Sequence, residues 1–301
     1  MHRIITFGAV TLFCSQILAL QQPPVYRGGV DLVRLGVTVT DRQGRLITNL
    51  TADDFDVQED GVRQTVQYFV NATSPAPGMH LGLLLDVSDS MEDDIAFTRT
   101  ASIRFVRALD EAVDITLADF DTEVRLVQYT QADIPRLVER IRMRKTHGDT
   151  ALFDAIGVYL DGAADQTGRK VMLLYTDGGD TRSAMGLSGV MDLLKASDVT
   201  VYAIGVFDQR SMTGRVDQQL VLRQIADATG GKAFFPLSIK DLDKAYEEVL
   251  AEIRAQYTLG YLSTNARLNG AWRKVDIKIR GGRAPDARLR ARKGYFALYR
   301  P

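Results

Sequence analysis

Thiol groups are nearly absent from this chain of 301 residues, whose single cysteine, Cys14, lies among the first twenty. The remainder of the chain can therefore form neither a disulfide nor a thiolate metal site. Only three histidines occur, and His80 and His147 lack the spacing of a histidine metal site or of a base–nucleophile pair. These absences disfavour histidine-based metal or hydrolytic chemistry.

The chain also lacks an excess of charge of either sign. Lys and Arg together number 37, Asp and Glu 38, and the net charge is −1. Such a balance gives no general attraction to polyphosphates or anionic lipids, so nucleic acid is disfavoured as a partner. The apolar fraction of 46% and the charged fraction of 25% are those of a globular protein.

A long apolar run occurs only at the start of the chain. The basic start Met1-His2-Arg3 is followed by an apolar stretch at residues 4–20. This pattern predicts a secretory signal peptide at residues 1–20, and hence a secreted or periplasmic protein. The alternative is an uncleaved membrane anchor, but the stretch is short for a bilayer span and contains several polar residues. After cleavage we expect no membrane span.

Strand patterns occupy both ends of the chain that follows. Apolar residues alternate with other residues from Val33 to Val39 and again from Val275 to Ile279, the period of a half-buried strand. The dipeptide Asp60-Gly61 is typical of a tight hairpin. Each end is too short to bury much surface alone. We therefore predict that residues 21–77 and 256–301 together form one smaller β-sandwich.

Near the end of the chain, Arg288, Arg290 and Arg292 alternate along one predicted strand. We expect their shared face to be the solvated side of the sandwich, with a basic contact patch as the alternative.

Residues 78–255 show a different pattern, in which apolar strands alternate with amphipathic helices. This alternation predicts an α/β domain with a doubly wound, mostly parallel, Rossmann-like sheet inserted into the sandwich. The expected helices lie at about 91–110, 131–143, 151–165, 186–197, 217–229 and 240–255. Residues 123–129 are expected to form an edge strand reached by a hairpin.

Oxygen-bearing side chains follow the predicted parallel strands. The segment Asp86-Val87-Ser88-Asp89-Ser90 comes directly after the apolar run 81–85, and Thr176-Asp177-Gly178 comes after the run 171–175. Gly148-Asp149-Thr150 precedes a predicted helix. Open α/β sheets bind ligands at the carboxyl ends of their strands. An all-oxygen set suits a hard cation, so we predict a site for Mg²⁺ or, as alternatives, Ca²⁺ or Mn²⁺.

Each of these residues also has an explanation without a metal. Ser90, with Asp93 three residues later, is a good capping box for a helix beginning at Met91. Thr150 is suited to a helix start and Asp177 to a turn. Asp86 is harder to explain in this way, because a carboxylate that ends an apolar strand needs a partner.

The order and spacing of the three segments resemble those of a von Willebrand factor type A domain. In that family, five such side chains form the metal-ion-dependent adhesion site. By this resemblance they would be Asp86, Ser88, Ser90, Thr150 and Asp177. Outside the α/β domain, three further segments resemble secreted bacterial relatives of that family: Val57-Gln58-Glu59-Asp60-Gly61, Tyr257-Thr258-Leu259-Gly260-Tyr261 and Arg290-Ala291-Arg292-Lys293-Gly294-Tyr295.

The resemblance implies metal-dependent adhesion to a protein ligand that supplies an Asp or Glu carboxylate, with no enzymatic activity. We assign no catalytic residues and no residues that bind an organic cofactor. One alternative is a metal-dependent phosphohydrolase with Asp86 as nucleophile, although such enzymes place a second aspartate where Ser88 stands here. A second alternative is a metal-free scaffold used in envelope assembly. The sequence leaves the partner's identity and the oligomeric state open.

Overall fold

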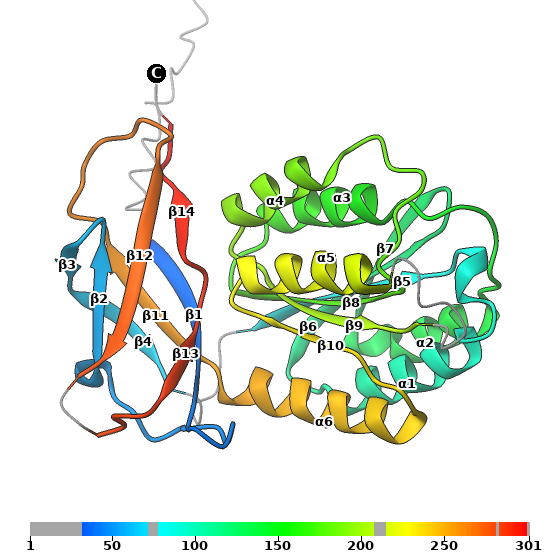
Figure 1. The fold of residues 1–301 in the computed structure, drawn as a ribbon, viewed down its shortest axis with the longest axis horizontal. Coiled ribbons are helices and arrows are strands. Elements are labelled where there is room, and N and C mark those ends of the chain that lie inside the picture. Colours follow the sequence, from blue (N-terminus) through cyan, green and yellow to red (C-terminus); the bar gives the residue numbers. More distant parts are fainter. Residues whose placement is uncertain (1–31, 72–77, 208–214, 281–282, 300–301) are drawn as a thin grey trace, which may run out of the picture. The chain divides into compact units, whose positions relative to one another are not determined.

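The computed structural model describes residues 32–71, 78–207, 215–280 and 283–299 (Figure 1). The predicted signal peptide lies outside these residues. The described residues belong to one compact unit, Leu32–Pro301. No helix in this part of the chain is long and apolar enough to cross a membrane.

A six-stranded sheet forms the centre of the α/β part. Its strand order is β10-β9-β8-β5-β6-β7, and all neighbours are parallel except β7, which runs antiparallel to β6 at the edge. This agrees with the predicted mostly parallel sheet and its antiparallel edge strand. The bounds of the strands are β5 Met79–Asp86, β6 Ala112–Phe120, β7 Val124–Thr130, β8 Arg169–Thr176, β9 Thr200–Gly205 and β10 Lys232–Phe234.

Three helices cover each face of this sheet (Figure 1). The first helix layer consists of α1 Ile95–Ala108, α2 Ile134–Met143 and α6 Ile239–Ala255. The second consists of α3 Leu152–Ala164, α4 Leu187–Ala196 and α5 Arg215–Ala228. Alternate strand residues face opposite sides of the sheet, so Leu83 packs against the first layer and Leu84 against the second. Strands buried on both faces explain the continuous apolar runs in the sequence.

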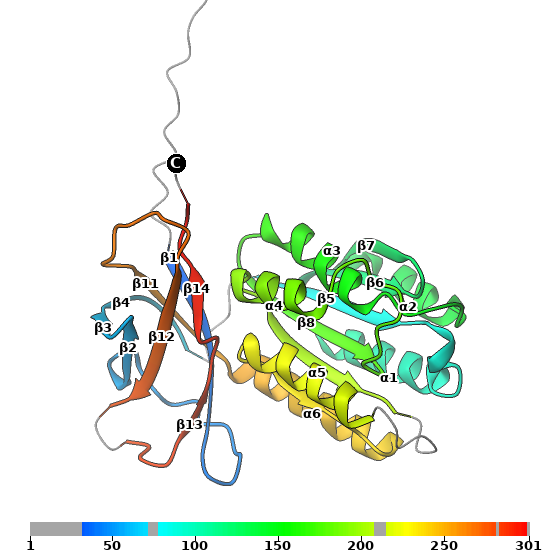
Figure 2. The ribbon, with the colours of Figure 1, turned by 45° about the horizontal axis from the view of Figure 1, so that its top comes forward.

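Two four-stranded antiparallel sheets combine strands from both ends of the chain. Their orders are β13-β1-β11-β4 and β14-β12-β2-β3. In Figure 2 the blue strand β1 and the red strand β13 accordingly lie side by side. The bounds are β1 Leu32–Thr40, β2 Phe55–Glu59, β3 Val62–Gln64, β4 Val66–Val70, β11 Tyr257–Leu262, β12 Trp272–Ile279, β13 Arg288–Arg290 and β14 Gly294–Phe296.

The hairpin predicted at Asp60-Gly61 joins β2 to β3, and both turn residues have positive φ. Such a backbone suits a glycine and tolerates an aspartate. The returning arm of the hairpin does not continue as one strand. It divides at Thr65, where β3 stays in one sheet and β4 enters the other.

A buried ion pair lies within the sheet that contains β2 and β12, and Tyr261 of β11 links it to the other antiparallel sheet. Glu59 of β2 is 2% exposed and Arg273 of β12 is 3% exposed, and the Arg273 Nη1 atom lies 2.9 Å from the Glu59 carboxylate. Hydroxyl groups of Tyr261, Ser263 and Tyr295 also donate hydrogen bonds to that carboxylate. The acid comes from the front segment and all four donors come from the back segment.

Two sequence-based expectations need correction. Helix α1 begins at Ile95 rather than near Met91, because residues 89–91 form a separate 3₁₀ turn. The arginine face is not fully solvated: Arg290 pairs with Glu252 of α6, and Arg292 donates to the carbonyl oxygens of Ser197 and Arg34. The structure thus gives both guanidinium groups acceptors that the sequence pattern did not reveal.

Candidate functional site

The site is built around Asp86, the last residue of the central strand β5. Its side chain is fully buried. The Ser88 hydroxyl donates to Oδ1 at 2.5 Å, the Ser88 amide donates to the same oxygen at 3.0 Å, and the Thr176 hydroxyl donates to Oδ2 at 2.6 Å. Both carboxylate oxygens are therefore held in fixed directions by neutral donors.

The segment after β5 places two hydroxyl groups together. The Ser88 and Ser90 hydroxyl oxygens lie 3.0 Å apart. Ser90 lies within the 3₁₀ turn, and the residue that precedes α1 is Asp94. The capping box proposed for Ser90 is therefore not the arrangement that the structure has, and its hydroxyl stays beside Ser88.

The segment with Thr150 is fastened directly to the Asp86 loop. The Asp89 amide donates to the Gly148 carbonyl oxygen at 3.0 Å, and the His147 amide donates to the Val87 carbonyl oxygen at 2.8 Å. Gly148 has φ +75°, a conformation that favours glycine. Thr150 is buried at 4% exposure.

The third segment, which follows β8, is fastened to the second. The amides of Thr181 and Arg182 donate to the Thr150 carbonyl oxygen at 2.9 and 3.0 Å, and the Thr150 amide donates to the Thr181 hydroxyl at 3.0 Å. These bonds occupy the main chain of Thr150, and its hydroxyl takes part in none of them. The structure thus brings the three predicted loops together.

Asp177 is the second carboxylate of the site. Its Oδ1 atom accepts the Gly179 amide at 2.8 Å, and its charge contributes to raising the pKa of Asp86. Burial is the larger cause, and together these effects raise the Asp86 pKa to about 7 against hydrogen bonds that act in the opposite direction.

This donor set is a test of whether a cation would fit. Asp86 is a buried carboxylate, and within the described part of the chain its hydrogen bonds come only from neutral groups. A divalent cation would supply the positive charge that such a group needs. No three His, Cys, Asp or Glu side chains gather as a metal site among the described residues. A site here would therefore take most of its protein ligands from hydroxyl groups.

Sequence reasoning missed Thr176, which is fully buried and orients Asp86. The signal was present, because this threonine ends β8 directly before Asp177.

Sequence reasoning also missed a cluster of ion pairs beside the site. The fully buried Asp119 of β6 forms ion pairs with Arg125, Arg140 and Arg144, with nitrogen–oxygen distances of 2.6 to 2.9 Å. Arg125 also pairs with Asp121, whose carbonyl oxygen accepts the Ala151 amide at 2.8 Å. The arginines are separated along the sequence and come from β7, from α2 and from the loop after α2, so no short motif indicates the cluster.

Residues 80–252, more than half of the chain, match the family model of the von Willebrand factor type A domain. The chain belongs to the von Willebrand factor type A (VWA) family. The matched range contains the three loops described above. No curated protein matches this VWA chain at a significant level.

Several solved structures share the VWA fold with this chain at low sequence identity. A von Willebrand factor type A protein from Catenulispora acidiphila has a TM-score of 0.50 and 12% identity, covering 91% of this chain and 75% of that protein. The pilus adhesin SpaC from Lactobacillus rhamnosus GG has a TM-score of 0.51 and 10% identity, covering 81% of this chain and 48% of SpaC.

The PilB minor pilin from Streptococcus sanguinis is also similar, with a TM-score of 0.49 and 12% identity over 60% of this chain and 62% of PilB. The VWA chain thus spans less than two thirds of PilB and about half of SpaC. At these identities the likeness concerns the fold.

Proposed function

We propose that this VWA protein is a non-catalytic protein-binding module that acts outside the cytoplasm through a divalent metal. The metal ligands would be Asp86, Ser88, Ser90, Thr150 and Asp177. The observation that carries the proposal is Asp86, a fully buried carboxylate held by neutral donors where three loops meet. The likeness to the pilus adhesin SpaC is one of fold, so the proposal depends on the chain's own residues.

The ligand set favours Mg²⁺, with Ca²⁺ and Mn²⁺ as alternatives, because all five side chains offer oxygen atoms. The Ser88 hydroxyl donates its proton to Asp86, which leaves the lone pairs of its oxygen for a cation. The Thr150 hydroxyl is free of the bonds that fix its main chain.

Two carboxylates and three neutral hydroxyls leave a divalent ion incompletely neutralised. When bound, it would supply an electrophilic centre whose open position accepts an Asp or Glu carboxylate from a partner protein. Ser90 is exposed whereas Asp86 and Ser88 are buried, so the partner would approach from the Ser90 side. A phosphohydrolase would need a general acid at position 88, and Ser88 there favours binding over that reaction.

Calorimetric titration with MgCl₂ and MnCl₂ tests the metal part of the proposal. Wild-type protein is expected to bind one ion saturably, and Asp86→Ala and Asp177→Ala are expected to lose that binding. Asp149→Ala is the matched control, because Asp149 is exposed. The substitution removes the same charge one residue from Thr150. Metal binding that survives in both site variants would defeat the proposal.

Capture of acidic peptides tests the adhesive part. Immobilised wild-type protein is expected to retain peptides with Asp or Glu in Mg²⁺ and to release them in EDTA. The Ser88→Ala plus Ser90→Ala variant is expected to retain none. Turnover of a phosphate ester that Asp86→Asn abolishes would favour the phosphohydrolase instead, and peptide capture independent of metal would favour the metal-free scaffold.

A further inference from the structure

A cavity lies at the opposite end of the central sheet from the loops that carry Asp86, Thr150 and Asp177. It has a volume of about 520 Å³ and is lined by residues of β1, β4 and β11 on one side and by residues near the start of β5 and β8 on the other. A volume of this size is in the range of small-molecule sites. The parallel strands β5 and β8 have their amino ends here, and none of the proposed metal ligands lines the cavity.

The lining of this cavity is predominantly cationic. Arg34, Arg169 and Lys170 contribute positive charges, whereas Asp198 is the carboxylate among the lining residues. Lys170 Nζ lies 2.8 Å from Asp198, so these two charges offset one another. Within the described part of the chain, neither arginine forms an ion pair. Arg34 instead lies over the Tyr68 ring at 5.9 Å.

Arg169 is the decisive residue. Its Nε and Nη2 atoms are buried and have no hydrogen-bond partner among the described residues. Burial lowers the pKa of its guanidinium group, a sign that the charge is poorly solvated, yet an arginine keeps its charge in a protein. Buried donors without acceptors are costly. Arg169 lines the cavity, and an anion there would offset its poorly solvated charge.

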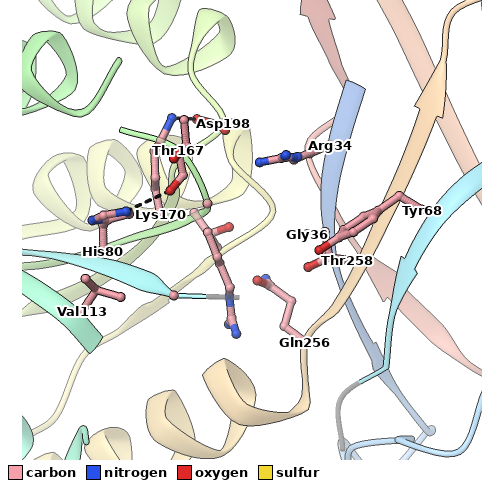
Figure 3. Close-up of a pocket in the computed structure, with 14 residues that line it drawn as sticks. Arg34, Gly36, Tyr68, His80, Val113, Thr167, Lys170, Asp198, Gln256 and Thr258 are labelled. Atoms are coloured by element: carbon pink, nitrogen blue, oxygen red, sulfur yellow. Dashed lines mark hydrogen bonds and ion pairs between the residues drawn. The ribbon is translucent and has the colours of Figure 1, made fainter. Parts of the chain in front are cut away.

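Arg34 and two neutral side chains line the cavity from the sandwich side. Figure 3 shows the Arg34 guanidinium, the Tyr68 hydroxyl and the Gln256 amide directed toward the cavity from the sandwich side. Gln256 is 5% exposed, and a side chain at Gly36 would come within 2.9 Å of its amide group. The glycine therefore leaves room for Gln256 at the cavity wall.

We propose that this cavity binds a small organic anion with carboxylate or phosphate oxygens, held by Arg34 and Arg169 and oriented by Tyr68 and Gln256. The two arginines come from β1 and β8, so the anion would also stabilise the packing of the antiparallel sheets on the α/β part. This inference is independent of the metal site.

Calorimetric titration of the full chain with succinate and, separately, with inorganic phosphate tests the proposal. The buffer is free of divalent metals and of constant ionic strength, so that binding at the metal loops does not contribute. We expect saturable binding of at least one anion and a rise in melting temperature. Preference for succinate or for phosphate distinguishes a carboxylate ligand from a phosphate ligand.

Two variants and one control locate the binding. Arg34→Gln removes the charge of an exposed side chain. Arg169→Met removes the charge of a partly buried side chain and leaves an unbranched apolar chain in its place. Each is expected to weaken anion binding at least about tenfold. Arg136→Gln, which alters an exposed arginine on α2, is expected to leave it unchanged. Absence of saturable binding to the wild type, or equal affinity in all four proteins, would overturn the proposal.

Discussion

At the scale of single residues, Asp86 depends on the neighbours that hold it. One carboxylate oxygen accepts two donors from Ser88, and the other accepts the Thr176 hydroxyl. Because Ser88 and Thr176 fix the orientation of the carboxylate, its remaining lone pairs point in fixed directions. Residues that orient a metal ligand by hydrogen bonds influence its metal affinity.

Thr176→Val removes the hydroxyl while conserving the shape of the side chain. We expect Mg²⁺ affinity to fall by roughly tenfold, because partners of metal ligands are typically worth ten- to a hundredfold. Thr98→Val is the control, since Thr98 is a buried threonine of α1 whose hydroxyl has no partner among the described residues. Calorimetry measures both, and equal affinities in the two variants would show that Thr176 does not orient Asp86.

At the scale of elements, the segment between α2 and α3 carries Thr150 and is anchored by arginines. Arg144, the first residue after α2, pairs with the fully buried Asp119 at 2.6 Å. Breaking one contact of a buried charge network leaves the remaining groups less well compensated.

Arg144→Gln is expected to loosen residues 145–151, to speed their amide hydrogen exchange and to weaken metal binding. Arg142→Gln is the matched control, because Arg142 pairs with Glu139 on the exposed side of α2. Hydrogen-exchange mass spectrometry of both variants checks this prediction. Unchanged exchange in Arg144→Gln would mean that the hydrogen bonds to Gly148 and His147 suffice to hold the segment.

Glu59 is the corresponding anchor of the antiparallel sheets. Burial alone would raise its pKa, but hydrogen bonds from four side chains outweigh this effect and hold the pKa below the ordinary value of 4.5. A carboxyl group with a lowered pKa in the folded state stabilises the fold above that ordinary value. This contribution is lost as the pH falls below it, through the folded-state pKa.

Glu59→Gln is expected to lower the free energy of unfolding of this part by about 3 kcal/mol near neutral pH, because Arg273 is left buried without its counter-charge. The deficit relative to wild type should shrink on acidification below pH 4.5. Glu139→Gln is the exposed control. Urea unfolding across this pH range measures the effect, and a constant difference between the two proteins would contradict the assigned role.

At the scale of the whole molecule, we propose that residues 21–77 and 256–301 fold as one domain around the α/β part at 78–255. Strand β1 pairs with β11 and β13, and β2 pairs with β12, so most strand partners of the front segment come from the back segment.

Removal of residues 256–301 is expected to unfold residues 32–71, because β1 and β2 lose those partners, while residues 78–255 keep their helices and sheet. Hydrogen exchange of the truncated chain distinguishes the two parts. Protected amides in residues 32–71 would show that the front segment folds without the back segment.

Much of the fold was accessible from sequence because its two periodicities are strong. The apolar run Leu81–Leu85 belongs to a strand buried on both faces, and the alternation at Val275–Ile279 belongs to a strand with one face toward the core. The partial burial of Arg290 and Arg292 could not be predicted, because it depends on acceptors at Glu252 and Ser197 that only the tertiary structure brings near. The start of α1 was misplaced for a related reason: residues 89–91 form a turn that is bonded to Gly148.

The predicted site loops meet in the structure, but the sequence did not reveal what holds them. Thr176 lies in the segment Thr176-Asp177-Gly178, but its role in orienting Asp86 was not predicted. Asp119 lies within a strand, and its partner Arg144 is 25 residues later in the sequence. Long-range ion pairs leave no local pattern.

We propose that one divalent metal ion is held by Asp86, Ser88, Ser90, Thr150 and Asp177. Anomalous diffraction from crystals grown with Mn²⁺ tests this proposal. We expect one strong peak between these five side chains, coordinated by their oxygens directly or through bridging waters. A peak elsewhere, or none at saturating Mn²⁺, would contradict it.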